Sequence, residues 1–185
     1  SHFSGVKFLI NDLLLYLKPL RSIGIGIKVG GKAKQAKSLS DQVDEVLSSD
    51  QQMIMFPAGM CSRYQRGIGI QDLDWKKTFV SKAVQYKRRV VPIYYNGRNS
   101  TFFYALAFIR KSLGIKVNIE MLFLVDELYK SQNKTFKAYF GEPIDWQYFD
   151  NKEKSPKVLA NEIKRLIYSK KENLCQDKSN SIILQ

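Results

Sequence analysis

The sequence predicts a single α/β domain in which a mostly parallel sheet is flanked by helices. Its length of 185 residues fits one domain. The apolar fraction of 44% and the charged fraction of 25% are ordinary for a folded globular protein. Strand-like and helix-like segments alternate along the chain, which is typical of α/β folds. With no internal repeat or linker, we expect residues 1–169 to form the domain and residues 170–185 to form a polar tail.

The first part of the chain alternates helical and extended patterns. Phe8, Leu13 and Tyr16 recur at helical spacing, and Pro19 ends that pattern. The predicted elements are a helix over residues 6–20, a strand over 22–27, an amphipathic helix over 32–48, a buried strand over 53–56 and a long polar loop over 57–74.

The second part continues the alternation. Asp74 is the predicted N-cap of the next helix, and Ser155 followed by Pro156 is a typical start for the last one. The predicted elements are a helix over residues 75–86, a buried strand over 90–95, a turn at Asn96-Gly97, a helix over 102–113, strands over 116–125 and 134–140, and a helix from residue 156. The aromatic run at residues 102–104 is predicted to be core; an exposed face on it would indicate membrane anchoring.

The net charge of +13 indicates an anionic partner. Nucleic acid, a phosphorylated substrate and an anionic membrane all fit such a charge.

No apolar run reaches the roughly 18–20 residues that span a bilayer. Two cysteines far apart in sequence, Cys61 and Cys175, favour a reducing compartment and exclude a cysteine zinc site. We therefore expect no bound metal or cofactor.

The strongest candidate site follows the predicted strand that ends at Phe56. Ligands of open α/β sheets bind at the carboxyl ends of the strands. Gly59, Ser62 and Arg63 lie directly after this strand end, and an arginine fork with neutral donors beside it suits a phosphate or a carboxylate. The alternative is that Arg63 is only a surface charge that keeps the loop in water.

Two other motifs are incomplete. Residues 26–33 nearly spell a phosphate-binding loop between a strand and a helix, and residues 122–126 resemble a strand with a metal-binding Asp, but Ala33 lacks the hydroxyl that holds magnesium. Lys32 can still attract an anion because it lies near a predicted helix N-terminus. Cys61 as a nucleophile would need a base, and the single histidine is His2.

Several blocks resemble the glycerophospholipid acyltransferase family of lysophosphatidic-acid-acyltransferase type, and in particular its bacterial hemolysin-like branch. The F-P-A-G-M-C-S-R run that starts at Phe56 and Pro57 resembles the family's F-P-E-G-T-R-S block, and V-V-P, which ends at Pro92, resembles a later one. The D-L-D-W-K-K run at residues 72–77 and N-G-R-N-S, which contains Asn96 and Arg98, match the branch. The resemblance covers residues 6–146 and implies a glycerolipid-acyltransferase-like fold.

The resemblance implies transfer of a fatty acyl group from acyl-CoA or acyl carrier protein to a hydroxyl of a lysophospholipid or related anionic lipid. It implies that Lys32, Gly59, Ser62 and Arg63 bind the acceptor's anionic head, with Phe56, Pro57, Pro92, Asn96 and Arg98 in support. The family's catalytic His-x4-Asp pair does not occur in these residues. We expect that pair in a segment before Val6, and no catalysis by the 185 residues alone.

The resemblance also implies a cytoplasmic enzyme that is peripheral on the inner face of the cell membrane. Its expected partners are anionic membrane lipid and the acyl donor, including acyl carrier protein, and no nucleic acid. Because Ala58, Met60 and Cys61 replace the family's Glu, Thr and Arg, a head group other than glycerol phosphate, such as an acylated amino acid, remains open. The alternative function is a non-catalytic basic domain that binds lipid or nucleic acid.

Overall fold

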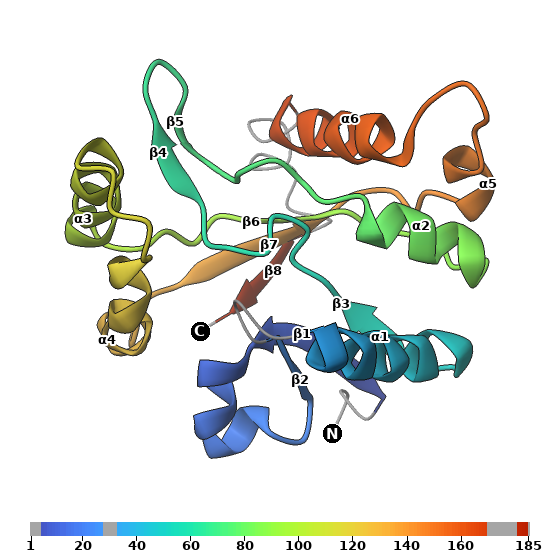
Figure 1. The fold of residues 1–185 in the computed structure, drawn as a ribbon, viewed down its shortest axis with the longest axis horizontal. Coiled ribbons are helices and arrows are strands. Elements are labelled where there is room, and N and C mark those ends of the chain that lie inside the picture. The colour runs from blue at the N-terminus through green and yellow to red at the C-terminus, as the bar shows by residue number, and fades with distance from the viewer. Residues whose placement is uncertain (1–4, 28–32, 170–180, 185) are drawn as a thin grey trace.

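A three-stranded parallel sheet forms one layer of the computed structural model, which describes residues 5–27, 33–169 and 181–184 (Figure 1). Its strand order is β2 (Gly24–Ile27), β1 (Val6–Asn11), β3 (Gln52–Ile54), with both neighbours parallel to β1. Helix α1 (Ala33–Ser48) joins β2 to β3 and packs Val43, Val46 and Leu47 inward. The α/β class and the parallel sheet flanked by helices are thereby confirmed.

The predicted helix over residues 6–20 is wrong. Residues Val6–Asn11 are the central strand, and two 3-10 helices follow, η1 (Asp12–Tyr16) and η2 (Lys18–Leu20). A central parallel strand is covered on both faces and therefore carries a continuous apolar run, which also satisfies a helical spacing over so short a stretch.

A second sheet is antiparallel and lies between the parallel sheet and the upper helices in Figure 1. Strand β7 (Phe136–Phe140) is its centre, with β6 (Ile93–Tyr95) and β8 (Ser181–Leu184) on either side. The expected polar tail thus contributes a strand at residues 181–184, while residues 170–180 lie outside the described part.

The strand predicted over residues 90–95 is shorter and less buried than expected. Val90 makes only an isolated bridge to Ile144, and Val91 and Ile93 are exposed. Pro92 is buried, and its carbonyl accepts a hydrogen bond from Gly141 N at 2.8 Å. Asn96, predicted in a turn, instead extends the pairing of β6 with β7, because its Oδ1 accepts from Lys137 N at 2.8 Å.

The main apolar core lies among three helices on the right of Figure 1: α2 (Thr78–Gln85), α5 (Trp146–Phe149) and α6 (Pro156–Ser169). The buried side chains of this core are Ala58, Trp75, Phe79, Val80, Ala83, Phe149, Leu159, Ala160 and Ile163. Helix α6 begins at Pro156, as predicted. Asp74 is not the N-cap of α2, which begins only at Thr78; its carboxylate lies 3.9 Å from Lys157 Nζ instead.

The left side of Figure 1 carries a hairpin and a helical unit. Strands β4 (Arg63–Gln65) and β5 (Gly69–Gln71) form an antiparallel hairpin inside the stretch predicted as a loop. Helix α3 (Thr101–Ser112) confirms the predicted helix, with Ser100 Oγ accepting from Phe103 N as its N-cap.

The strand predicted over residues 116–125 is wrong, because residues 119–125 are helical and residues 116–118 belong to no strand. Helix η3 (Ile119–Phe123) runs into α4 (Leu124–Lys130). Leu, Met and Glu favour helix over strand, and the short apolar run alone could not distinguish the two. The likeness of residues 122–126 to a strand with a metal-binding Asp is therefore lost.

Candidate functional site

The loop after β3 begins with a tight turn that requires glycine. Gly59 has φ of +69° and donates to Phe56 O at 2.9 Å. A Cβ at Gly59 would lie 2.8 Å from Lys76 Nζ, and Lys76 N donates to Pro57 O at 2.9 Å. The turn therefore places the exposed lysine of the D-L-D-W-K-K block directly over the F-P-A-G block.

Asp72 ties the same two blocks together through side chains. Ser62 Oγ donates to Asp72 Oδ1 at 2.7 Å, and Trp75 Nε1 donates to Asp72 Oδ2 at 3.1 Å. Tyr168 on α6 accepts from Asp72 N through its hydroxyl at 3.0 Å, and burial raises the pKa of Tyr168 to about 12. The Ser62 hydroxyl is thus already bonded within the protein.

Arg63, the predicted anion binder, lies inside the protein and is only 8% exposed. Its guanidinium donates to Glu120 Oε1 at 2.8 Å and to Cys61 O at 2.9 Å, and it covers the Phe103 ring at 5.2 Å from the centroid. Arg110 Nε lies 2.8 Å from the other Glu120 oxygen. In this geometry Arg63 joins the loop to η3 and α3, and its contact with a lipid head stays a prediction.

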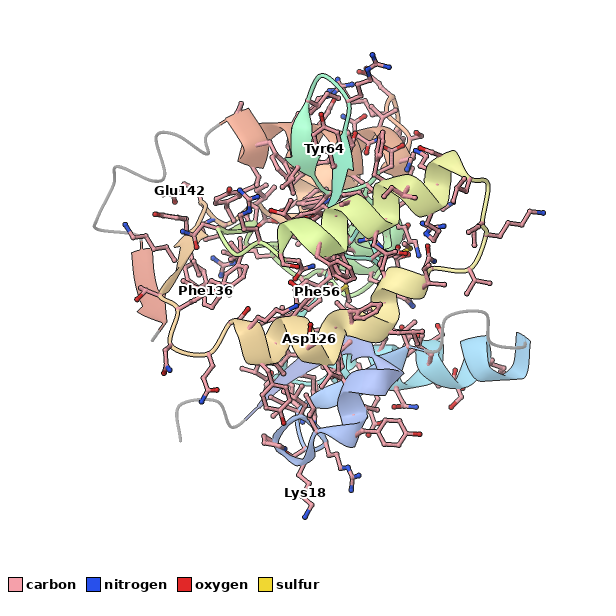
Figure 2. The ribbon with its side chains drawn as sticks, turned by 90° about the vertical axis from the view of Figure 1, so that its left-hand side faces the viewer. Lys18, Phe56, Tyr64, Asp126, Phe136 and Glu142 are labelled. Carbon is pink, nitrogen blue, oxygen red and sulfur yellow. The ribbon has the colours of Figure 1, made fainter. Side chains whose placement is uncertain are left out.

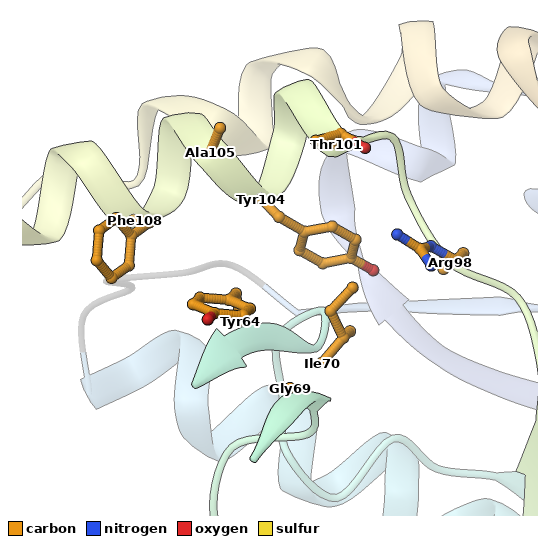
Figure 3. A pocket seen from close by; sticks show the side chains of 8 residues that line it. All are labelled: Tyr64, Gly69, Ile70, Arg98, Thr101, Tyr104, Ala105 and Phe108. Carbon is orange, nitrogen blue, oxygen red and sulfur yellow. The ribbon is translucent and has the colours of Figure 1, made fainter. Parts of the chain in front are cut away.

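A cavity of about 440 Å³ lies between the hairpin and α3 (Figure 3). Its volume is within the usual range for small-molecule sites. Tyr64 and Phe108 meet edge to face, with ring centroids 5.9 Å apart. The lining residues are Tyr64, Gly69, Ile70, Arg98, Thr101, Tyr104, Ala105 and Phe108. Most of this wall is aromatic or aliphatic, so it can hold a hydrocarbon chain.

Arg98 is the cation of this cavity. Its guanidinium points toward the Tyr104 hydroxyl in Figure 3, and the side chain is exposed. Among the residues that the structure describes, no carboxylate lies within ion-pair distance of Arg98 and no hydrogen bond engages its guanidinium. A cation beside an apolar wall can bind an amphiphile with an anionic head.

The N-G-R-N-S block meets the F-P-A-G block behind this cavity. Asn99 N donates to the Tyr104 hydroxyl at 3.0 Å, and the Asn99 side chain lies beside the Cys61 thiol. Burial raises the pKa of Cys61, which disfavours the thiolate that a nucleophile needs. Three separate sequence blocks therefore form one connected cluster.

Of the predicted site residues that the structure describes, only Arg98 lines this cavity, and Lys32 lies outside the described part of the chain. Pro92 and Asn96 support the β6–β7 pairing and do not line the cavity. Lys32, and with it most of the phosphate-loop-like segment, belongs to the undescribed residues, as does His2. Within the described ranges, no group of His, Cys, Asp and Glu could hold a metal ion.

The sequence reasoning missed Glu120 and the aromatic wall of Tyr64 and Phe108. Glu120 could have been noticed in the sequence, because it is the one carboxylate among the mostly apolar residues 117–125, and a carboxylate that is buried requires a charged partner. Tyr64 and Phe108 carried none, because their approach depends on how the hairpin packs against α3.

Comparisons with known proteins place the chain among acyltransferases. An acyltransferase family model matches residues 1–172. A lyso-glycine lipid O-acyltransferase of Bacteroides thetaiotaomicron is 52% identical over 168 residues, which cover 90% of this chain and 60% of the relative. Another lyso-glycine lipid O-acyltransferase, from Phocaeicola vulgatus, is 48% identical over 169 residues, covering 91% and 59%. No solved structure matches significantly.

These matches test the resemblance that the sequence blocks carried. The chain spans about three-fifths of the length of its two relatives. The matches alone therefore do not assign the activity of the whole relatives to this chain. The matches do establish the family, because the family model covers nearly all of the described residues and each relative is about half identical to this chain where the two align. The chain belongs to the acyltransferase family.

Proposed function

We propose that the chain is the lipid-binding part of an O-acyltransferase whose acceptor is a single-chain lipid with a carboxylate head, specifically a lyso-glycine lipid. The observation that carries the proposal is the apolar cavity with the exposed Arg98 beside it, next to the cluster of family blocks. The names of the two relatives supply the acceptor class.

The chemistry of such an acceptor fits the two kinds of surface. A glycine that is acylated on its amino group keeps its carboxylate, and arginine binds carboxylates through paired hydrogen bonds. The hydrocarbon chain then lies against Tyr64, Ile70 and Phe108. Lys76 over the Gly59 turn is a second exposed cation near the loop, and it would add attraction for the anionic head.

The proposed reaction is transfer from a thioester, acyl-CoA or acyl carrier protein. The acceptor hydroxyl oxygen forms an ester bond to the acyl carbon, the carbon–sulfur bond breaks, and the hydroxyl proton ends on the released thiol. The described residues include no histidine, so we assign to them binding and orientation of the acceptor and no proton transfer. No cofactor enters this step.

The site of action in this proposal is the inner face of the cell membrane, where the protein binds peripherally to anionic lipid. The charge of +13 supports it. None of the described helices has the length and apolar character needed to cross a membrane.

The test is an acyl-transfer assay on the full-length protein that contains this chain. Acyl-CoA and acyl carrier protein serve as donors in parallel, and the acceptors are a lyso-glycine lipid, lysophosphatidic acid and a lysolipid with a neutral head. The expected product is the doubly acylated glycine lipid, identified by mass spectrometry. Absence of product with every donor and acceptor, from a folded protein, would reject the proposal.

A further inference from the structure

The solvent-facing side of α3, η3 and α4, together with the connection between α3 and η3, exposes a group of apolar side chains. We call this surface the outer face and define it by Phe102, Ile109, Leu113, Val117, Leu122 and Tyr129. Each of the six side chains is between 50% and 76% exposed. Single exposed hydrophobic residues are ordinary, but a contiguous group marks an interaction surface.

Helical spacing makes the group contiguous. Phe102, Ile109 and Leu113 are seven and four residues apart, so they form one stripe on α3. Leu122 and Tyr129 form a second stripe along η3 and α4 with the same spacing of seven. The two stripes adjoin, because the rings of Phe102 and Phe123 meet edge to face at 5.2 Å between centroids. Figure 2 faces these helices, with α3 crossing above α4.

The charges around the outer face are mainly positive where they are exposed. Lys111, Lys116 and Lys130 are exposed, and Lys116 stands between Ile115 and Val117. Of the three carboxylates in residues 101–130, Glu120 and Glu127 are buried, and only Asp126 reaches solvent, where it pairs with Lys130. Lysine stems can lie along an apolar surface while their amino groups stay in the polar layer.

We propose that the outer face docks on an anionic lipid bilayer. Its composition, aliphatic and aromatic side chains with lysines among them, is that of interfacial membrane-binding segments. The overall charge of +13 adds long-range attraction to an anionic surface. This inference rests on the peripheral membrane association proposed above and adds the surface that makes the contact.

Docking by this face places the cavity next to the bilayer. Ala105 lines the cavity, and it lies one helical turn from both Phe102 and Ile109 on α3. The cavity therefore borders the outer face along α3. A lipid acceptor that leaves the bilayer beside α3 has a short path along apolar surface to Tyr64 and Phe108.

The test is co-sedimentation of the full-length protein with vesicles of phosphatidylcholine containing about 30% phosphatidylglycerol, over a series of lipid concentrations. Val117→Glu is the test variant, and Val158→Glu on α6 is its matched control, since both valines are exposed and only Val117 belongs to the outer face. We expect Val117→Glu to weaken binding about tenfold or more, and Val158→Glu to stay within about twofold of the wild type. Leu122→Gln serves as a second, uncharged variant and is expected to weaken binding in the same direction.

Two outcomes would overturn the proposal. Val117→Glu and Leu122→Gln could bind as the wild type does, as they would if another part of the longer protein covered this face. Val158→Glu could also lose as much binding as Val117→Glu, which would leave only non-specific charge. Circular dichroism of every variant confirms that the fold is intact.

A parallel assay separates this inference from the proposed function. Acyl transfer to a monomeric acceptor, below its critical micelle concentration, is expected to stay within about twofold of the wild type in Val117→Glu, because docking is then not needed. If the wild type transfers no acyl group at all while Val117→Glu still loses vesicle binding, the docking surface stands and the proposed function fails.

Discussion

The two helical regions of the molecule differ in whether charged side chains are buried in their interiors. Between α2, α5 and α6 the interior is apolar, with Val80, Leu159 and Ala160 at most 1% exposed. Around α3, η3 and α4 the interior holds charged side chains beside apolar ones such as Phe103, with Glu120 fully buried between two arginines and Glu127 accepting from Ser100 Oγ. The solvent-facing surface of the α3 region, which includes the outer face, is rich in apolar side chains. This difference is the basis of the proposed binding role of the α3 region, because apolar groups left in water stabilise nothing until a ligand or surface covers them.

The largest effect is expected from breaking the ionic interior. Glu120→Ala leaves Arg63 and Arg110 buried without a counter-charge, and we expect it to lower the free energy of unfolding by about 3–5 kcal/mol. Urea unfolding measures this. The control is the triple variant Arg63→Met, Arg110→Met, Glu120→Leu, which removes all three charges and is expected to recover most of the loss. An Ala variant within about 1 kcal/mol of the wild type would contradict the ionic interior.

The triple variant also separates two roles of Arg63. If Arg63 only holds the loop to η3, the triple variant keeps its Michaelis constant for the acceptor. If Arg63 binds the lipid head as well, the variant folds but its Michaelis constant rises. Both outcomes are read from the same protein preparation.

The second effect tests the apolar core on the other side of the comparison. Leu159→Ala removes buried methyl groups from a packed interior and is expected to cost about 2–5 kcal/mol of unfolding free energy. Its Michaelis constant for the acceptor should not change, since Leu159 does not line the cavity. Leu159→Met, which keeps the volume, should cost less than about 1.5 kcal/mol. A cost for Met as large as that for Ala would contradict tight packing here.

The smallest effect concerns the Cys61 thiol between the two regions. Burial raises the pKa of Cys61, so the folded state favours the protonated thiol. The unfolded chain then loses its proton first, near the ordinary thiol pKa of about 8.5. Stability from this group is present below that pH and falls as the pH rises above it.

Urea unfolding of the wild type and Cys61→Ala at about pH 7 and about pH 10 measures this difference. The wild type should lose more stability than the variant over that interval, with Cys175 common to both proteins. Equal losses would show that the Cys61 environment does not favour the protonated thiol.

The sequence predicted those elements whose pattern was long or whose ends were marked. The amphipathic spacing before Ser48 gave α1, and Ser155 with Pro156 gave the start of α6. Residues 6–11 and 116–125 were assigned wrongly because a short apolar run fits a helix and a strand alike, and neighbours far away in sequence decide between them.

The sequence predicted only part of the candidate site, because some of its contacts also join residues that are far apart in the sequence. Gly59 and Ser62 lie in the cluster where the blocks meet, and Arg98 lines its cavity. Arg63 has the residue type of an anion binder, but its counter-charge Glu120 lies 57 residues further on, so the ion pair could not be read from the local sequence. The Tyr64–Phe108 wall depends on tertiary packing alone.

The central claim is that Arg98 recognises the acceptor's anionic head beside an apolar cavity. Steady-state acyl transfer by the full-length protein tests it with two acceptors that differ only in the head, a glycine carboxylate and its neutral glycinamide. Arg98→Gln should raise the Michaelis constant for the carboxylate about tenfold or more and change that for the amide by less than about twofold. The matched control Arg89→Gln, an exposed arginine that does not line the cavity, should alter neither. An Arg98→Gln enzyme that treats both acceptors as the wild type does would contradict the account.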